Sequence, residues 1–199
     1  MKTSILDRWG IKPEELSEII ESNPSLRGLL MGYVAEYKFQ KLYLQDKRIE
    51  NIFKPDSHDR TEKGDWVITY KGVEISIQVK SLQTNTIEKS QGQYSAKFQC
   101  DASDRRKVTL PNGQSLETTC LLVGEFDLLA VNLYGFREKW KFAFAKNRDL
   151  PRSRYKKYTS EQPQFLIATN IAIALPLQPP FEAEPFRLLD AIVECKKSR

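Results

Sequence analysis

The chain has 199 residues, a length that suits one domain, and its 40% hydrophobic and 29% charged side chains exclude wholesale disorder. Its 31 basic and 26 acidic side chains leave a net charge of +5, a mild preference for polyanionic partners. Three scattered cysteines exclude a disulfide framework, and no stretch approaches the ~20 apolar residues of a membrane span, so we expect a soluble, cytoplasmic protein.

The first part of the chain predicts two helices and a loop. Pro13 and the two glutamates that follow it begin a short helix that ends near Ser22. A second helix restarts at Asn23-Pro24, and apolar side chains recur along it at helical spacing, namely Leu26, Leu30, Tyr33, Val34, Tyr37 and Tyr43 or Leu44. Residues 46–63 are polar and predict a loop.

The second part predicts strands and a closing helix. Residues 83–117 indicate irregular polar chain with a turn at Pro-Asn-Gly. The segment FDLLAVNLY is apolar on both faces, as in a buried central strand, and KWKFAFA is its expected partner across a turn at Gly135. QFLIATNIAIALPL predicts another strand, and LLDAIVEC a helix. Together these elements predict an α/β protein with a mixed β-sheet flanked by helices, one domain with its core at 23–145 and a C-terminal extension at 146–199.

Between these parts lies a predicted hairpin at residues 65–80, GDWVITYKGVEISIQVK with its flanks. A two-residue loop at Lys71-Gly72 places Asp65 directly opposite Gln78, with Cβ atoms ~5 Å apart. Lys80 follows on the same face, about 7 Å further along the strand. The register therefore gathers a carboxylate, an amide and an ammonium group at one end of the hairpin.

This set of groups suits metal-assisted hydrolysis of a phosphodiester. Carboxylate and carbonyl oxygens are ligands that Mg²⁺ prefers, and a lysine can steady an attacking hydroxide or a phosphoryl oxygen. The alternative is a solvated hairpin edge on which an acid and an amide-x-lysine fall together by chance.

At these residues the chain resembles the PD-(D/E)xK nuclease superfamily, which includes many type II restriction endonucleases. Asp65 matches the first acid of the motif, Lys80 its lysine, and Glu36 in GYVAEYKFQKL the glutamate of an upstream helix. The resemblance implies a restriction endonuclease-like core, with Mg²⁺, or Mn²⁺ in its place, held by Asp65, Gln78, the main-chain carbonyl of Val79 and Glu36. Lys80 would then orient or activate the water.

Two positions depart from the family pattern. Gln78 stands where the family usually has an acid, and Gly64 replaces the proline of the motif. The loss of a charge weakens Mg²⁺ binding, and a decayed, inactive nuclease would show the same change. Pro55-Asp56 offers the literal dipeptide but precedes the strand, so we prefer Asp65, and Glu74 lies too far along the polar face to join the site.

Other features point to a partner or exclude a mechanism. His58 is the single histidine and has no nucleophile motif around it, and no phosphate-binding GxxxxGK[ST] loop exists. Two basic clusters could follow a DNA backbone or could be solvated faces. They comprise Arg105, Arg106 and Lys107, and then Arg152, Arg154, Lys156 and Lys157.

The sequence therefore predicts a Mg²⁺-dependent DNA endonuclease, of the type II restriction-modification kind, that cuts double-stranded DNA as a homodimer. A repair or junction-resolving nuclease is the nearest enzymatic alternative. The alternative from another class is a nucleic-acid-binding module on the same scaffold with a disabled site. Metal-dependent plasmid cleavage that is lost in Lys80→Ala would indicate an enzyme, whereas DNA binding without cleavage would indicate a module.

Overall fold

The computed structural model describes residues 3–55 and 64–198, and the chain forms two compact units, Met1–Val34 and Ala35–Arg199. The first unit contains α1 (Ile5–Trp9), α2 (Pro13–Ser22) and the first turns of α3 (Pro24–Phe39). Of its described residues none is buried.

The buried face of α3 differs from the predicted one. Leu30 and Tyr33 of the expected apolar stripe are 38% and 54% exposed, whereas Ala35 and Phe39 are buried. The helix continues into a π-helical turn, Gln40–Leu44, which buries Leu44. The buried side chains of α3 therefore begin at Ala35, which is the first residue of the second unit.

The second unit is built on a mixed five-stranded sheet, as predicted. It comprises β1 (Ile49–Phe53), β2 (Trp66–Tyr70), β3 (Val73–Ser81), β8 (Leu128–Asn132) and β9 (Phe142–Lys146), in the order β1-β2-β3-β8-β9. Strands β3 and β8 run parallel, and the other neighbours are antiparallel. Strand β8 is buried along its whole length, which confirms the predicted central strand.

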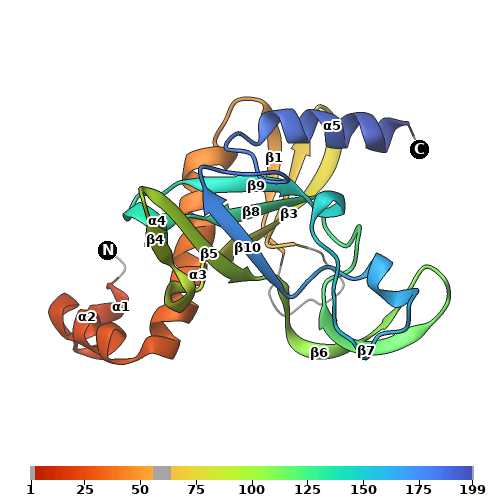
Figure 1. Ribbon diagram of the computed structural model, residues 1–199. Coiled ribbons are helices and arrows are strands. Elements are labelled where there is room, and N and C mark those ends of the chain that lie inside the picture. The colour runs from red at the N-terminus through yellow and green to blue at the C-terminus, as the bar shows by residue number, and fades with distance from the viewer. Residues whose placement is uncertain (1–2, 56–63, 199) are drawn as a thin grey trace. The chain divides into compact units, whose positions relative to one another are not determined.

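Both faces of this sheet are covered. One face packs against α5 (Phe186–Lys197) and the end of α3, in a cluster that includes Phe39, Ile77, Phe144 and Leu189. The other face packs against a three-stranded sheet of β4 (Glu88–Ser90), β5 (Gln93–Gln99) and β10 (Asn170–Leu175). Figure 1 shows α5 and this small sheet on opposite sides of the five-stranded sheet.

A two-stranded ribbon extends away from these layers. It is formed by β6 (Asp101–Thr109) and β7 (Ser115–Cys120), joined by the predicted Pro-Asn-Gly turn (Figure 1). Its inner side packs on residues from later in the chain, in a small cluster of Val108, Leu110, Cys120 and Leu166 with partly buried neighbours that include Tyr158.

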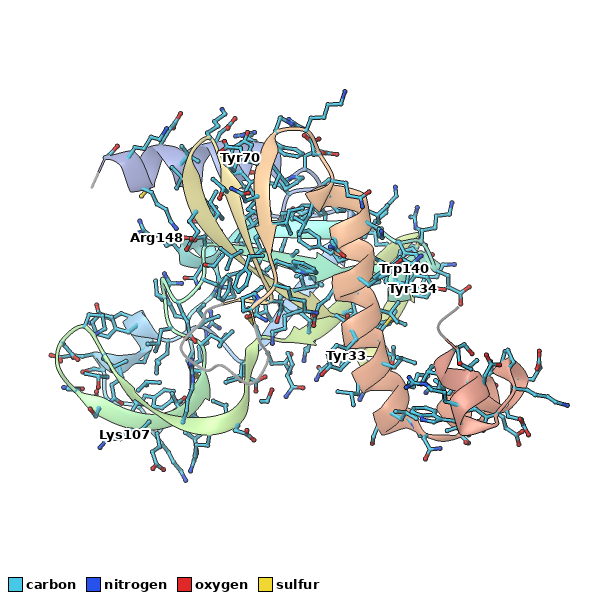
Figure 2. All side chains as sticks on the ribbon, turned by 180° about the vertical axis from the view of Figure 1, so that it is seen from behind. Tyr33, Tyr70, Lys107, Tyr134, Trp140 and Arg148 are labelled. Carbon is cyan, nitrogen blue, oxygen red and sulfur yellow. The ribbon has the colours of Figure 1, made fainter. Side chains whose placement is uncertain are left out.

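The hairpin register is confirmed. Tyr70 pairs with Val73 and Trp66 with Ile77, so the strands keep the predicted alignment. The loop residues Lys71 and Gly72 both have positive φ, 51° and 70°, as a two-residue hairpin loop of the preferred handedness requires. The apolar side chains of this hairpin face the α5 side of the sheet, where the hydroxyl of Tyr70 donates to Asp190 at 2.8 Å (Figure 2).

Two local predictions were wrong. Strand β1 lies in the stretch 46–63 that predicted a loop, and 83–117 holds β4 to β7 rather than irregular chain. The predicted pairing of β8 with β9 across Gly135 is confirmed, and the connection contains a helical turn, α4 (Tyr134–Arg137). Short 3-10 turns occur at Thr84–Thr86, Asn147–Asp149 and Gln162–Phe165. No helix in the described part of the chain has the length and apolar character to cross a membrane.

Candidate active site

Asp65 is the residue immediately before β2, and its carboxylate lies beside β3. Its own backbone N–H donates to the carbonyl of Ile77 at 2.8 Å. Its Oδ2 accepts two hydrogen bonds of 2.6 Å, one from the Gln78 amide nitrogen and one from the Val79 backbone N–H. The structure thus brings Asp65, Gln78 and the Val79 main chain together.

The local geometry follows from the glycine before Asp65. Gly64 has a φ of +82°, and a Cβ added there would lie 2.8 Å from the Ile77 carbonyl oxygen. Only glycine fits such an approach without strain. Regular pairing between β2 and β3 ends at Trp66, so the Asp65 side chain takes the place of a main-chain carbonyl opposite Val79. Odd-numbered residues of β3 direct their main-chain groups toward β2, so the Val79 carbonyl faces the same edge.

Burial sets the protonation chemistry of Asp65. The pKa of this carboxyl is raised to about 6 from 3.8, mainly by desolvation and also by the negative charge of Glu36. The hydrogen bond from Val79 and the charges of Lys80 and Lys54 oppose this rise in pKa without cancelling it. The hydrogen bond and the nearby positive charges therefore do not offset the cost of desolvating the charged carboxylate, and a cation bound here would stabilise its charged form.

Glu36 reaches the site from α3 and forms an ion pair with a residue that the sequence did not single out. Its carboxylate lies 2.7 Å from the Lys54 ammonium group, and the Glu36 side chain is only 17% exposed. The ammonium of Lys54 also lies 5.3 Å from the centre of the Trp66 ring. Recognition of β1 would have revealed Lys54, because the pairing of Phe53 with Val67 places the next residue beside Trp66.

Lys80 lies on the face of β3 that it shares with Gln78, opposite the face that packs against α5. The two residues align with Leu129 and Val131 of β8, whose side chains belong to the cluster under the small sheet. The ammonium group of Lys80 donates to the main-chain carbonyl of Asp101 at 3.1 Å, at the base of the ribbon.

The buried thiol of Cys100, next to Asp101, is a poor nucleophile. Desolvation raises its pKa to about 12, and the nearby charge of Lys80 lowers it only in part.

The donor set fits a hard divalent cation with few protein ligands. Among residues 3–55 and 64–198 no three histidine, cysteine or acidic side chains form a metal-holding group. Mg²⁺, however, commonly uses one or two carboxylates and completes its shell with water and substrate oxygens. Asp65 and the Val79 carbonyl would hold such a cation through oxygen. Gln78 would do so only through its amide oxygen, and Glu36, now paired with Lys54, could contribute a second carboxylate.

The first basic cluster divides into exposed and internal residues. Arg105 and Lys107 are exposed on β6, and Figure 2 shows Lys107 on the ribbon, away from the five-stranded sheet. The guanidinium of Arg106 instead lies 2.5 Å from the carboxylate of Glu125 and also bonds the Cys120 carbonyl. Arg106 therefore stabilises the base of the ribbon, and its guanidinium is engaged within the protein.

The second basic cluster divides in the same way. The guanidinium of Arg152 donates to the main-chain carbonyls of Leu150 and Arg148. Its neighbours Arg154, Lys156 and Lys157 are exposed. Of the seven basic residues singled out from the sequence, five remain available to a polyanion.

The remaining sequence candidates lie outside the site. Glu74 is exposed and its main-chain carbonyl accepts from Lys196. Asp56 and His58 fall outside the described residues. An open groove of about 860 Å³ runs along β10 and is bordered by Arg154, but neither Asp65 nor Lys80 lines it.

Comparisons with known proteins do not assign this chain to a family. No family model matches it, and no curated protein matches it. Among solved structures, that of a bacterial homing endonuclease matches with 16% identity over 69% of this chain and 86% of that chain, at a TM-score of 0.38. At this TM-score the similarity does not establish a shared fold or function.

Proposed function

We propose that this protein is a Mg²⁺-dependent DNA endonuclease of the PD-(D/E)xK kind, related in design to type II restriction endonucleases. The observation that carries the proposal is the partly buried Asp65 carboxylate at the edge of β3. It accepts hydrogen bonds from the Gln78 amide and the Val79 N–H, and its pKa responds to the charges of Glu36 and Lys80. The family resemblance assigns its site to these same residues.

A purely structural role accounts less well for Asp65. The carboxylate does cap the Val79 N–H, where regular strand pairing stops. An asparagine would make the same hydrogen bond without the cost of burying a charge, and the raised pKa of Asp65 shows that this cost is not recovered within the protein. Perturbed carboxyl groups beside specific charge partners are typical of functional sites.

The residues present would divide the work as follows. Bound Mg²⁺ would polarise the scissile phosphate and make a coordinated water more acidic. Asp65 would hold its carboxylate at the strand edge, and Glu36 would complete the negative charge on the helix side. Lys80, released from the Asp101 carbonyl, would donate to a phosphoryl oxygen or orient the attacking water.

The proposal is tested by cleavage of supercoiled plasmid with Mg²⁺ or Mn²⁺. We expect nicked and linear products from the wild-type protein and a loss of roughly 10²-fold or more in rate for Lys80→Ala. Lys89→Ala, a change of an exposed lysine on β4, should cleave at the wild-type rate and is the matched control. Cleavage that survives Lys80→Ala, or that proceeds equally in EDTA, contradicts the assignment.

One observation favours the non-catalytic alternative, a nucleic-acid-binding module. The Gln78 side chain directs its nitrogen, not its oxygen, toward Asp65, and so closes a hydrogen-bonded pair without a metal. Salt-sensitive DNA binding with no cleavage under either metal would support this module. A repair or junction-resolving nuclease would instead cut branched DNA in preference to plasmid.

We also propose that the enzyme cuts duplex DNA as a homodimer, because each chain offers one candidate site and a duplex has two strands. Sedimentation in the presence of a short duplex and Ca²⁺ should reveal two chains per DNA. A single chain per duplex, together with nicking that does not proceed to linear DNA, would contradict the dimer.

A further inference from the structure

The β6–β7 ribbon is long enough to span a DNA groove. The regularly paired part, Arg106–Thr109 with Ser115–Thr118, has four residues in each strand, which at ~3.4 Å per residue extend about 14 Å, compared with a major-groove width of about 12 Å. A two-stranded antiparallel ribbon is one of the two regular elements that the major groove of B-DNA admits. The ribbon leaves the layered part of the protein and presents one side to solvent (Figure 1).

The two sides of the ribbon have different chemistry. Its inner side carries Val108 and Cys120, which pack on Leu166. Its outer side carries two directly opposed pairs, Lys107 with Glu117 and Thr109 with Ser115, all of them exposed.

The outer side is suited to base edges rather than to phosphates. Lys107 faces Glu117, so their charges cancel, and the hydroxyls of Thr109 and Ser115 lie 3.2 Å apart. A nearly neutral row of donors and acceptors offers little attraction to a polyanion. Lysine, glutamate and hydroxyl side chains are nevertheless the types that hydrogen-bond to guanine, cytosine and other bases in the major groove.

The attraction to phosphate comes from the segment beside the ribbon. Arg154, Lys156 and Lys157 are exposed, and the next residue, Tyr158, fixes this segment to the ribbon through a 2.6 Å hydrogen bond with Thr118. Tyr158 also packs in the small cluster under β6 and β7. The basic segment and the neutral outer side of the ribbon are thus held together. Contacts from basic side chains to phosphates position a protein on DNA, whereas hydrogen bonds to base edges read the sequence.

The ribbon is also connected to the candidate active site. Its first residue, Asp101, accepts the hydrogen bond from the Lys80 ammonium group at 3.1 Å. A duplex that lies along the ribbon therefore begins beside the group that would contact the scissile phosphate.

From these observations we infer that the outer side of the β6–β7 ribbon reads DNA sequence in the major groove, while Arg154, Lys156 and Lys157 hold the adjacent phosphates. The inference rests on the proposed nuclease function and extends it to the element that gives specificity. It assigns base contacts to Lys107, Thr109, Ser115 and Glu117.

Binding selection from a randomised duplex pool, carried out in Ca²⁺ so that no hydrolysis is needed, tests the inference. The double variant Lys107→Ala/Glu117→Ala leaves the net charge unchanged. We expect it to lose roughly tenfold or more discrimination at two or three adjacent base pairs. Its affinity for unselected DNA and the dependence of that affinity on salt should remain those of the wild-type protein.

The basic segment gives the contrasting variant. Lys156→Ala/Lys157→Ala should weaken binding to all sequences and reduce the salt slope by about two, with the base preference retained. Lys139→Ala, on the loop after α4, should change neither quantity. Unchanged thermal unfolding midpoints establish that the variants are folded.

An unchanged base preference in Lys107→Ala/Glu117→Ala overturns the inference, and so does a wild-type protein that shows no base preference. These outcomes are separate from the nuclease test. Plasmid cleavage that depends on Lys80, together with an unaltered preference in the ribbon variant, would preserve the nuclease and dismiss the ribbon. Base selection that depends on the ribbon, in a protein that does not cleave plasmid, would support the ribbon's role and contradict the nuclease.

Discussion

Replacement of Asp65 by asparagine should stabilise the metal-free protein while removing the proposed metal ligand. Asparagine has nearly the same shape, and its side-chain oxygen can accept the hydrogen bond that the Val79 N–H now gives to the carboxylate. The Gln78 amide nitrogen donates to the same carboxylate oxygen, so the asparagine oxygen placed there can accept this bond as well. The substitution removes a buried charge and keeps the contacts.

The size of the effect follows from the pKa of Asp65. Because its folded-state pKa of about 6 exceeds the ordinary value of 3.8, the folded protein binds this proton more tightly than the unfolded chain. The resulting stabilisation is complete below about pH 4 and is lost as the pH rises through about 6. A difference of about two between the pKa values corresponds to about 3 kcal/mol.

We therefore expect Asp65→Asn to exceed the wild-type protein in free energy of unfolding by about 3 kcal/mol near pH 8 and by less than about 1 kcal/mol near pH 4. Urea unfolding in EDTA, followed by circular dichroism across this pH range, measures the difference. Asp149→Asn, a change of an exposed carboxyl on another loop, should show no such pH-dependent gain.

Addition of metal should reduce the stability advantage of Asp65→Asn near pH 8 by about half. With a Kd on the order of 1 mM, Mg²⁺ at roughly 10 mM would stabilise the wild-type protein by about 1.4 kcal/mol and leave Asp65→Asn unchanged. A variant that is less stable than wild type near pH 8, or one whose advantage does not vary with pH, would refute the reasoning about this carboxyl. A metal response that persists in the variant would place the cation elsewhere.

Three further outcomes are expected. Gln78→Glu should bind Mg²⁺ at least several-fold more tightly by calorimetry, and should lower metal-free stability by about 1–3 kcal/mol because it adds a second carboxylate beside Asp65; weaker Mg²⁺ binding would contradict this. Leu128→Ala, at a fully buried position of β8, should cost about 3 kcal/mol in urea unfolding, and a loss below about 1 kcal/mol would show that the site is not tightly packed. In the native protein a thiol reagent near neutral pH should modify the exposed Cys195 and spare Cys100, whose pKa burial raises to about 12; equal reactivity of the two would contradict the placement of Cys100.

The hairpin could be predicted from the sequence to the level of individual pairs because two independent signals agree there. The Lys71-Gly72 loop fixes which residues face each other, and the alternation of apolar and polar residues fixes which face is buried. The approach of Asp65 to Gln78 followed from that register alone.

The strands that prediction missed are those with little to bury. Strand β1 has exposed side chains at four of its five positions, and β6 exposes most of its residues to solvent. Their stability comes from main-chain pairing and from neighbours far along the chain, such as Leu166 under β6. A local pattern of apolar residues contains no trace of such contacts.

The site was predictable in its members but not in its charge balance. Lys54 came into view only with β1, and the Asp101 carbonyl that holds Lys80 belongs to a segment that reads as irregular. The orientation of the Gln78 amide depends on the hydrogen bonds of the folded protein, which sequence alone does not specify. In the α3 helix an apolar stripe misled the prediction because the exposed residues of the first unit include Leu26, Leu29, Leu30 and Tyr33.

The hydrogen bond between Lys80 and the Asp101 carbonyl connects the proposed catalytic lysine to the ribbon that we propose reads the DNA sequence. If the lysine must leave this carbonyl to act, then any shift of the ribbon on a well-matched duplex changes how easily it departs. Fidelity would then be expressed in turnover as well as in occupancy, and an incorrect site could be held by the protein yet remain uncut.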